Sequence, residues 1–265
     1  MIELRQLTFR YGGSGIRGSQ GSPAIFEGFD WRVEQGEAWA VLGPSGCGKS
    51  TLLYLLAGLR MPTGGEIYIG GERLKKPRPK TGLILQDYGL LPWATVRQNV
   101  SLGLRMRRFY GPDGQHAPLD EKQGDIDDHT RYWLERVGLT AAADQYPGQI
   151  SGGQGQRTAI ARTLALNPDL LLMDEPFASL DAPTRAGLQR LVKSLRSEQQ
   201  LTTVIVTHSI EEAAVLGKKI LVLGVPPTRK AVVINNQEAA DPDFPETAAY
   251  LDLCADLRAH LEADA

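Results

Sequence analysis

Short hydrophobic runs recur along the chain, and segments with helical spacing separate most of them. The runs EAWAVLG, TGLILQD, DLLLMDE, TTVIVTH and KKILVLG show no alternation with polar residues. Continuous hydrophobic runs of this length are typical of strands that are buried on both faces. Their alternation with helical segments predicts an α/β fold with a mostly parallel core sheet flanked by helices.

The first third of the chain has a different pattern. Residues 2–11 alternate imperfectly, and the phase breaks between Leu4 and Leu7, which predicts a strand with a bulge. A turn-rich segment, 12–23, is expected to form a flexible hairpin loop. Residues 29–33 (FDWRV) and 65–74 (GEIYIGGERL) predict one half-buried strand and a strand–turn–strand unit. We therefore expect an N-terminal antiparallel β subdomain.

Helical spacing dominates the other segments. Residues 49–60 predict an apolar helix that ends near Gly64 and Gly65. The region 92–166 contains no convincing strand and predicts a helical subdomain. Within it, the polar stretch 111–128 is expected to be an exposed loop of unknown role. Asp127 or Asp128 would cap the next helix and Gly138 would end it. Residues 246–265 predict a C-terminal amphipathic helical tail, and the 265 residues together predict one domain.

Composition and charge exclude several classes of protein. The formal net charge is −2, which gives no reason to expect nucleic-acid binding. Cys47 and Cys254 form no CxxC pair, so we expect neither a disulfide framework nor a zinc site, and a reducing compartment is the default. The N-terminus lacks the apolar core of a signal peptide. The longest apolar runs fall short of the ~20 residues that a membrane span requires. We expect a chain that is soluble alone, with membrane attachment through a partner left open.

A phosphate-binding motif lies between a predicted buried strand and a predicted helix. Residues 43–51 match G-x-x-x-x-G-K-[ST] and consist of Gly43, Pro44, Ser45, Gly46, Cys47, Gly48, Lys49, Ser50 and Thr51. In this pattern the glycines allow backbone N–H groups to surround phosphates. Lys49 would contact the β- and γ-phosphates, and the Ser50 hydroxyl would ligate Mg²⁺. A glycine-rich turn with an incidental lysine is the alternative, which the flanking strand and helix disfavour.

Polar residues at the ends of three other predicted strands suit hydrolysis. Asp174 would hold Mg²⁺ through water, and Glu175 would orient or deprotonate an attacking water. Gln86 could ligate the metal and orient water, and His208 could hydrogen-bond the γ-phosphate. Each of these residues alone could be an ordinary polar strand terminus. They support a nucleotide site only as a set.

The order of GPSGCGKST, LQD, ISGGQ, LLLMDEP, ASLD and VTH resembles the nucleotide-binding subunit of an ATP-binding cassette (ABC) transporter over roughly residues 1–225. This resemblance implies an ATP-hydrolysing P-loop domain of the ABC type with Mg²⁺ as cofactor. It implies that Tyr11 stacks on adenine and that Asp181 communicates across a dimer. It also implies that the signature residues Ser151, Gly152, Gly153 and Gln154 bind the γ-phosphate of ATP held by a second cassette. Two ATP molecules would then lie between two head-to-tail cassettes and drive their dimerisation.

The stretch LQDYGLLPWATVRQNV is similar to the importer branch for nitrate, sulfonates, taurine and related solutes. In that branch Leu90, Leu91 and Trp93 would form the groove that receives a membrane permease. The implied partners are permease subunits, a second identical or similar cassette and, indirectly, an external solute-binding protein. The implied location is the cytoplasmic face of the cell membrane.

The main alternative is the ATPase of an ABC exporter or lipoprotein-release system. A soluble ABC protein usually carries two cassettes, a coiled coil or zinc insertions, which this chain lacks. An inactive binding module is disfavoured by the complete set Lys49, Ser50, Asp174, Glu175 and His208.

Two positions depart from the family pattern. Gly155 stands where an arginine usually follows SGGQ, and Ser209 stands where an aspartate usually follows the histidine. The first departure questions one contact near the signature, and the second leaves open how His208 is oriented.

Overall fold

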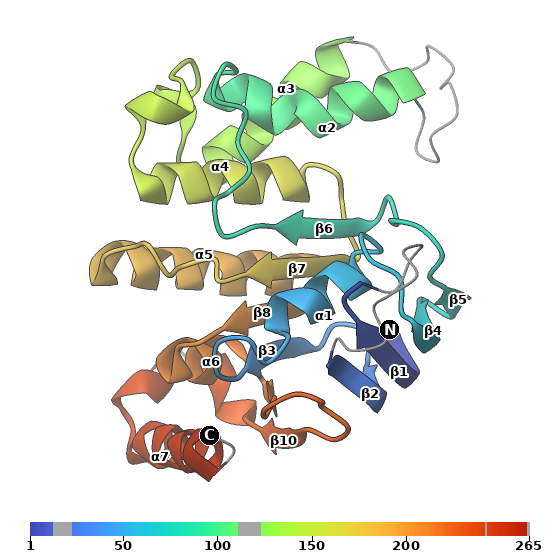
Figure 1. Ribbon diagram of the computed structural model, residues 1–265. Coiled ribbons are helices and arrows are strands. Elements are labelled where there is room, and N and C mark those ends of the chain that lie inside the picture. The colour runs from blue at the N-terminus through green and yellow to red at the C-terminus, as the bar shows by residue number, and fades with distance from the viewer. Residues whose placement is uncertain (13–22, 111–122, 242, 264–265) are drawn as a thin grey trace. The chain divides into compact units, whose positions relative to one another are not determined.

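The computed structural model describes residues 1–12, 23–110, 123–241 and 243–263 (Figure 1). The chain divides into two compact units. Unit 1 consists of Met1–Arg78 together with Gln200–Ala265, and unit 2 consists of Pro79–Gln199. The hairpin loop predicted for 12–23 and the first part of the polar stretch 111–128 lie mostly outside the described residues.

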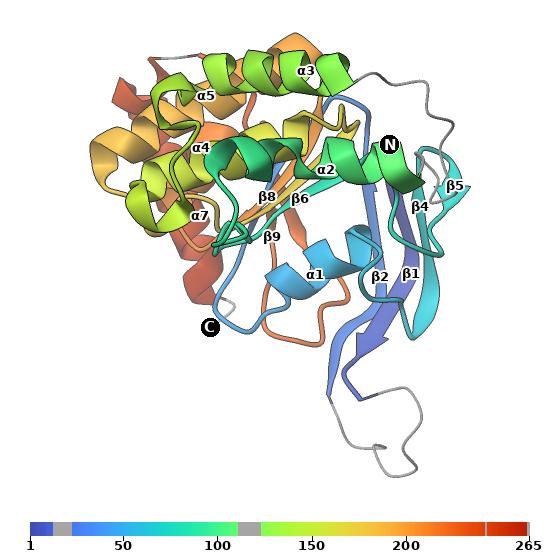
Figure 2. The same ribbon diagram turned by 90° about the horizontal axis from the view of Figure 1, so that it is seen from above.

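Unit 1 contains an antiparallel sheet with the strand order β2-β1-β4-β5. Its strands are β1 (Ile2–Arg10), β2 (Ala24–Val33), β4 (Gly64–Ile69) and β5 (Glu72–Arg73), and β1 and β2 run side by side in Figure 2. The predicted bulge is confirmed: the register with β2 shifts between Leu4 and Leu7, and Gln6 adopts φ +50°. Asp30 accepts hydrogen bonds from the backbone N–H and the side-chain amide of Gln6. Strand β2 begins at Ala24, ahead of the predicted 29–33 segment.

Unit 1 also contains the strands β3 (Ala38–Leu42), β8 (Thr202–Thr207), β9 (Lys219–Val222) and β10 (Val232–Asn235). β3 pairs in parallel with β8 and β9, and β10 pairs antiparallel with β9. Every residue of β3 and β8 is buried, as their continuous hydrophobic runs predicted. The sequence pattern did not predict β10. Most residues of this strand are exposed, so buried and exposed positions do not alternate along it.

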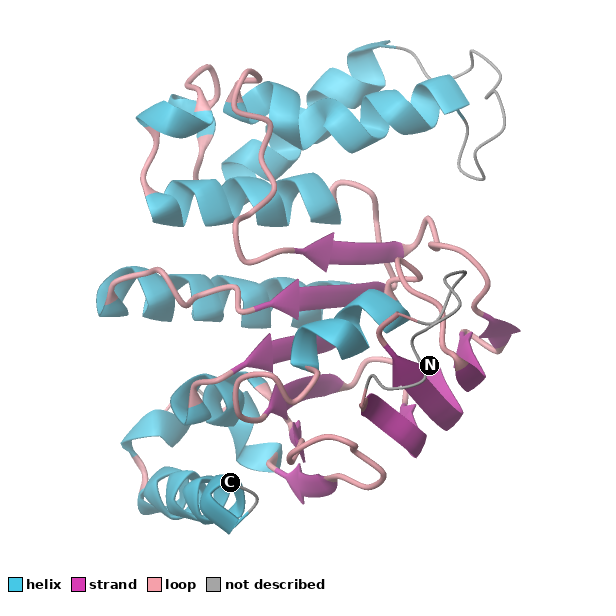
Figure 3. Ribbon diagram, viewed as in Figure 1, coloured by secondary structure: helices cyan, strands magenta, loops and turns pink. Residues whose placement is uncertain are grey.

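Among its described residues, unit 1 has the α-helices α1 (Lys49–Leu56), α6 (Ile210–Leu216) and α7 (Ala248–Ala263). Two 3-10 turns, Gln237–Ala240 and Phe244–Glu246, precede α7. The amphipathic tail is confirmed, since Leu257 of α7 is fully buried in a cluster with residues of β3, β9 and α6. Figure 3 shows the segment next to the C-terminal end as a helix.

The predicted end of α1 is wrong. The helix ends at Leu56, because Gly58 adopts φ +72° and the N–H of Leu59 returns to the carbonyl of Tyr54. A left-handed glycine of this kind is a common way for a helix to end. Gly64 instead begins strand β4.

Unit 2 contains the parallel pair β6 (Thr81–Ile84) and β7 (Leu170–Asp174). Its helices are α2 (Val96–Tyr110), α3 (Gln123–Arg136), α4 (Gly152–Leu164) and α5 (Ala182–Gln199), with 3-10 turns at Thr140–Ala142 and Pro147–Gln149. Helices α2, α3 and α4 pack against one another (Figures 1 and 2). Within the described part of 92–166 no strand interrupts these helices, which agrees with the predicted helical region.

The predicted start of α3 is wrong. The helix begins at Gln123, so Asp127 and Asp128 lie inside it, and Asp128 pairs with Arg131 at 2.9 Å. Ile126 is only 2% exposed, so the buried face of the helix begins before the two acids that were expected to cap it. The predicted end is confirmed: Gly138 adopts φ +70°, and the N–H of Leu139 bonds the carbonyl of Leu134 at 2.7 Å.

The confirmed fold class is therefore α/β, with an antiparallel sheet, parallel strand pairing and flanking helices. Within the ranges that the structure describes, no helix is both long and apolar enough to cross a membrane.

Candidate nucleotide site

The phosphate loop connects β3 to α1 in unit 1. β3 ends at Leu42 and α1 begins at Lys49, so the motif has the predicted strand–loop–helix context. Gly48 forms the N-cap of α1 with φ +105°. A Cβ on Gly48 would lie 2.3 Å from Cγ2 of Ile25 on β2. The position therefore requires glycine both for its backbone angle and for its lack of a side chain.

Lys49 points into this loop rather than into solvent. Its side chain is buried, and its ammonium donates hydrogen bonds to the carbonyls of Gly43 at 2.7 Å and Pro44 at 3.0 Å. An ammonium group has three donors, and these two carbonyls engage two of them. The positive charge is thus fixed at the centre of the loop that the sequence assigned to phosphates.

Cys47 is a buried free thiol in the same loop. Burial raises its pKa above the ordinary value, because it disfavours the charged thiolate. Cys254 is also free and buried. Over the ranges that the structure describes, no cluster of His, Cys, Asp and Glu has the arrangement of a metal site.

Tyr11 lies next to the phosphate motif. Its hydroxyl and the hydroxyl of Thr51 are 2.8 Å apart, and the guanidinium of Arg60 lies 4.9 Å from the centre of its ring. The side chain is 41% exposed. This places an accessible aromatic ring beside the loop, and its stacking on adenine stays a prediction.

His208 comes directly after β8, and Gly43 comes directly after β3. The last residues of these parallel strands, Thr207 and Leu42, are paired with each other. His208 therefore lies at the same edge of the parallel strands as the phosphate loop. The next residue, Ser209, caps α6, since its hydroxyl accepts a hydrogen bond from the N–H of Glu212 at 3.1 Å. Serine is among the preferred N-cap residues, so the departure from aspartate keeps a capping residue directly after the histidine.

Unit 2 brings the acids and Gln86 to one edge of its strand pair. Asp174 is the last residue of β7 and is 5% exposed. Glu175 follows it with φ +44°, a left-handed conformation that non-glycine residues rarely adopt. Gln86 is exposed and lies in a turn beyond Ile84, the last residue of β6, rather than ending the strand as expected.

The loop after Gln86 carries the predicted permease-contact residues. Leu90 and Leu91 are both half-buried, and Trp93 is 73% exposed. Sequence reasoning missed Asn99, which is fully buried and holds this loop. Its amide accepts from the N–H of Leu91 at 2.8 Å and donates to the carbonyl of Ala94 at 3.0 Å.

The signature residues form the start of α4. The Ser151 hydroxyl accepts from the N–H of Gln154 at 3.3 Å, and the Gln154 side chain accepts from the N–H of Ser151 at 2.9 Å. This reciprocal pair is a capping box. A Cβ on Gly153 would lie 2.5 Å from Cγ2 of Thr184 on α5, so only glycine fits there.

Asp181 is exposed and caps α5. Its carboxylate accepts from the N–H of Thr184 at 3.0 Å, and this bond lowers the pKa of Asp181 below its ordinary value. The signature helix and the segment that carries Asp181 therefore meet within unit 2, at Gly153 and Thr184.

Sequence reasoning also missed three residues that connect the signature helix to neighbouring segments. Arg162 belongs to the helix, and Tyr88 and Ser179 belong to the neighbouring segments. Tyr88 lies in the stretch LQDYGLLPWATVRQNV and Ser179 in ASLD, but neither pattern indicated that the two hydroxyls meet. Arg162 belongs to none of the motifs used.

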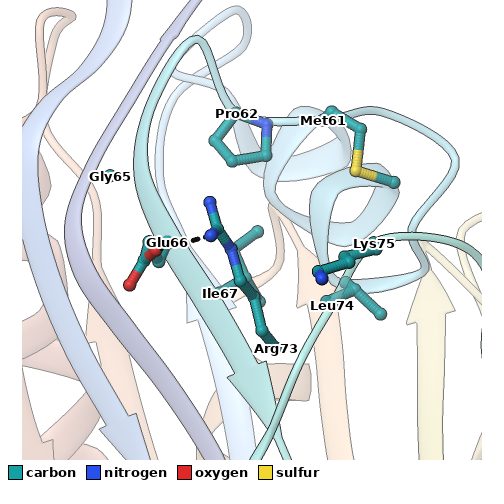
Figure 4. Close-up of a pocket in the computed structure, with 8 residues that line it drawn as sticks. All are labelled: Met61, Pro62, Gly65, Glu66, Ile67, Arg73, Leu74 and Lys75. Atoms are coloured by element: carbon teal, nitrogen blue, oxygen red, sulfur yellow. Dashed lines mark ion pairs between the residues drawn. The ribbon is translucent and has the colours of Figure 1, made fainter.

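A separate cavity of about 360 Å³ lies beside β4 and β5 in unit 1. Arg73 and Glu66 point toward each other there and form an ion pair at 2.9 Å (Figure 4). The residues that line it lie between Met61 and Lys75 and include none of the motif residues.

Comparison with known proteins places these motifs in context. A family model described as ABC transporter matches residues 26–178. The chain is 39% identical over 217 residues to the aliphatic sulfonates import ATP-binding protein SsuB of Bacillus cereus, which covers 82% of this chain and 80% of SsuB. It is 43% identical over 197 residues to the bicarbonate transport ATP-binding protein CmpC of Synechococcus elongatus, which covers 74% of this chain but only 28% of CmpC.

A solved structure is similar over most of the fold. It is the dimeric post-hydrolysis state of the ATP-binding cassette MJ0796 bound to ADP and phosphate, with a TM-score of 0.74 and 29% identity. The match covers 89% of this chain and 98% of that chain.

Proposed function

Because the chain belongs to the ABC transporter family and is an ATP-hydrolysing cassette, we propose that it powers import of a small oxyanion through a membrane permease. The observation that carries the proposal is the phosphate loop between β3 and α1, with the ammonium of Lys49 fixed inside it. The solute class is supported by the names of two relatives, a sulfonate importer and a bicarbonate transporter, since both solutes are small oxyanions. Nitrate is also a small oxyanion, and taurine carries a sulfonate group.

ATP binding uses the residues of unit 1. The N–H groups of the loop and of the first turn of α1 surround the phosphates, and Lys49 neutralises the β- and γ-phosphate charge. Tyr11 contributes an aromatic face for adenine next to Thr51.

Magnesium fits the donor set of Ser50, Gln86 and Asp174. All three offer oxygen atoms, the ligands that Mg²⁺ prefers, and a Mg²⁺ ion usually keeps several of its waters, so Asp174 can act through water. When bound, the ion neutralises charge on the β- and γ-phosphate oxygens.

Hydrolysis depends on three polar side chains. Glu175 orients the attacking water and accepts its proton, and Gln86 helps to position that water. His208 donates a hydrogen bond to a γ-phosphate oxygen, where negative charge develops. We propose that residues 1–265 form one ABC ATPase domain.

Dimerisation completes the site. Ser151, Gly152, Gly153 and Gln154 bind the γ-phosphate of ATP held by a second cassette, either a copy of this chain or a similar one. Asp181 transmits the state of one site to the other. The dimeric cassette of similar fold supports this arrangement.

The permease contacts Leu90, Leu91 and Trp93, and Trp93 offers the largest exposed apolar surface of the three. Contact with the permease places the chain at the cytoplasmic face of the cell membrane, and an external solute-binding protein delivers the oxyanion. The formal net charge of −2 gives no support for nucleic acid as a partner.

Two substitutions test the nucleotide site. Lys49→Ala should abolish ATP binding measured by calorimetry, because the buried ammonium is the charge that neutralises the phosphates. Glu175→Gln should bind ATP, hydrolyse it poorly and elute as a dimer in gel filtration with ATP. Undiminished ATP affinity of Lys49→Ala, or a monomeric Glu175→Gln with bound ATP, would contradict the respective assignment.

The solute is tested by purification from native membranes and identification of the permease that copurifies. The reconstituted complex should then import a sulfonate or bicarbonate in an ATP-dependent way. Transport of a cation or of a lipoprotein instead would refute the solute class.

A further inference from the structure

Tyr88 lies two residues after Gln86 and makes contacts with several segments of unit 2. It adopts φ +64°, and the following Gly89 adopts φ +56°. A left-handed tyrosine is uncommon and costs conformational energy, so its surroundings must hold it in place. Three separate contacts do so.

The first contact joins Tyr88 to the segment between the two proposed functional acids. The hydroxyls of Tyr88 and Ser179 are 2.8 Å apart and form a hydrogen bond. Ser179 lies between Glu175, which follows β7, and Asp181, which caps α5. This bond ties the Gln86 loop to the segment that carries both acids.

The second contact joins Tyr88 to the signature helix α4. A Cβ on Gly155 would lie 3.2 Å from Cδ2 and 3.4 Å from Cε2 of the Tyr88 ring. A Cβ on Gly152 would lie 3.8 Å from the Tyr88 hydroxyl. A side chain at 155 would therefore crowd the ring, which would have to move by a few tenths of an ångström, and this crowding favours glycine at a position where the family usually has arginine.

The third contact holds the backbone of the turn. Arg162 of α4 donates hydrogen bonds to the carbonyls of Tyr88 at 2.7 Å and Gly89 at 2.6 Å. A guanidinium that bridges two consecutive carbonyls fixes the turn to the same helix whose first residues are the signature.

We propose that Tyr88 is a positioning residue for ATP hydrolysis, because it holds the Glu175–Asp181 segment in a defined place relative to the signature helix. This inference rests on the proposed nucleotide site. Glu175 is itself left-handed at φ +44°, so its placement needs support from neighbouring segments. Since Lys49 and the phosphate loop belong to unit 1, loss of the Tyr88 bond should slow hydrolysis and leave ATP binding unchanged.

The test measures kcat and KM for ATP on the full chain, with a thermal melt of each variant. The variants are Tyr88→Phe, Ser179→Ala and the double substitution, and each removes the same hydrogen bond. Tyr132→Phe is the matched control, because the Tyr132 side chain is 48% exposed and contacts His129 and Trp133 through its ring. A net hydrogen bond corresponds to about a two- to tenfold change in rate.

We expect each single variant to lose about two- to tenfold in kcat. KM for ATP should stay unchanged, and the double variant should be no slower than either single one. Full kcat in Tyr88→Phe, or two losses that multiply in the double variant, would overturn the inference. If the wild-type chain hydrolyses no ATP, or Glu175→Gln is as fast as wild type, the proposed site fails instead.

A second pair of variants keeps the test independent of the hydroxyl. Gly155→Arg should lower kcat in the Tyr88 background, because the arginine and the ring compete for one space. In the Tyr88→Gly background the same substitution should cause no further loss. An equal loss in both backgrounds would show that the ring does not determine the space at 155 and would overturn the inference.

Discussion

The substitution Gly48→Ala would introduce two kinds of strain at the start of α1, an unfavourable backbone angle and a steric overlap. Gly48 has φ +105°, and a Cβ there would lie 2.3 Å from Cγ2 of Ile25. Gly46, in the same loop, has φ +83°, but among the described residues a Cβ there would meet no heavy atom within 4 Å. Gly46→Ala is therefore a matched control that introduces the backbone strain without the steric overlap.

The expected magnitudes follow from these two differences. A left-handed backbone costs a residue with a Cβ about 1–2 kcal/mol relative to glycine, so Gly46→Ala should destabilise the chain by that amount. Forcing an extra methyl group into a packed site adds about 1–3 kcal/mol. Gly48→Ala should therefore lower the free energy of unfolding by about 2–5 kcal/mol.

Urea unfolding followed by circular dichroism measures these differences, and Ile25→Ala supplies the rescue. Removing Cγ2 of Ile25 relieves the overlap but leaves the backbone angle, so Gly48→Ala should cost only about 1–2 kcal/mol in that background. The reasoning is refuted if Gly48→Ala costs no more than Gly46→Ala, or if Ile25→Ala leaves the cost of Gly48→Ala unchanged.

Three other predictions concern separate sites. Gly153→Ala should lower the free energy of unfolding by about 1–3 kcal/mol because its Cβ meets Thr184, and Thr184→Ser should remove that cost. Urea titration of the two single variants and the double variant measures the cost, and the same cost of Gly153→Ala in the Thr184→Ser background would contradict the contact. Trp93→Ala should change stability by less than about 0.5 kcal/mol, because the side chain is exposed, yet uncouple ATPase activity from transport in the reconstituted complex. Normal coupled transport would refute the permease contact. Cys47 should react slowly with iodoacetamide at neutral pH, because burial raises its pKa and keeps the thiol protonated. Mass spectrometry should show that its alkylation rate reaches half of the high-pH plateau only above the pH that an ordinary thiol requires, and rapid alkylation at neutral pH would contradict this.

The sequence predicted those features that depend on local spacing. The phosphate loop was predictable because its glycines and Lys49 lie close together in the chain, between a buried run and an apolar helix. The parallel strands were predictable because burial on both faces leaves continuous hydrophobic runs. The bulge in β1 was predictable because an inserted residue, here Gln6, breaks the alternation.

Features that depend on contacts between distant residues were not predictable. α1 ends before Gly58 because this glycine adopts a left-handed backbone angle. α3 begins before Ile126 because the buried side chain of Ile126 already belongs to the packed face of the helix. The glycine at 155 was an unexplained departure, since its cause is the ring of Tyr88, which is distant in the sequence. The glycine at 153 is likewise required by a distant residue, because a Cβ there would overlap Thr184.

The capping box at the start of α4 has a thermodynamic consequence. The Ser151 hydroxyl accepts from the N–H of Gln154, which leaves its own O–H available as a donor to an incoming phosphate. In the proposed dimer, the signature therefore needs no ordering step before it binds phosphate, and the entropy of fixing this turn is lost during folding rather than during dimer formation. For that reason, a variant such as Ser151→Gly should weaken ATP-dependent dimerisation mainly through a less favourable entropy, because the first turn would have to become ordered at the moment of association.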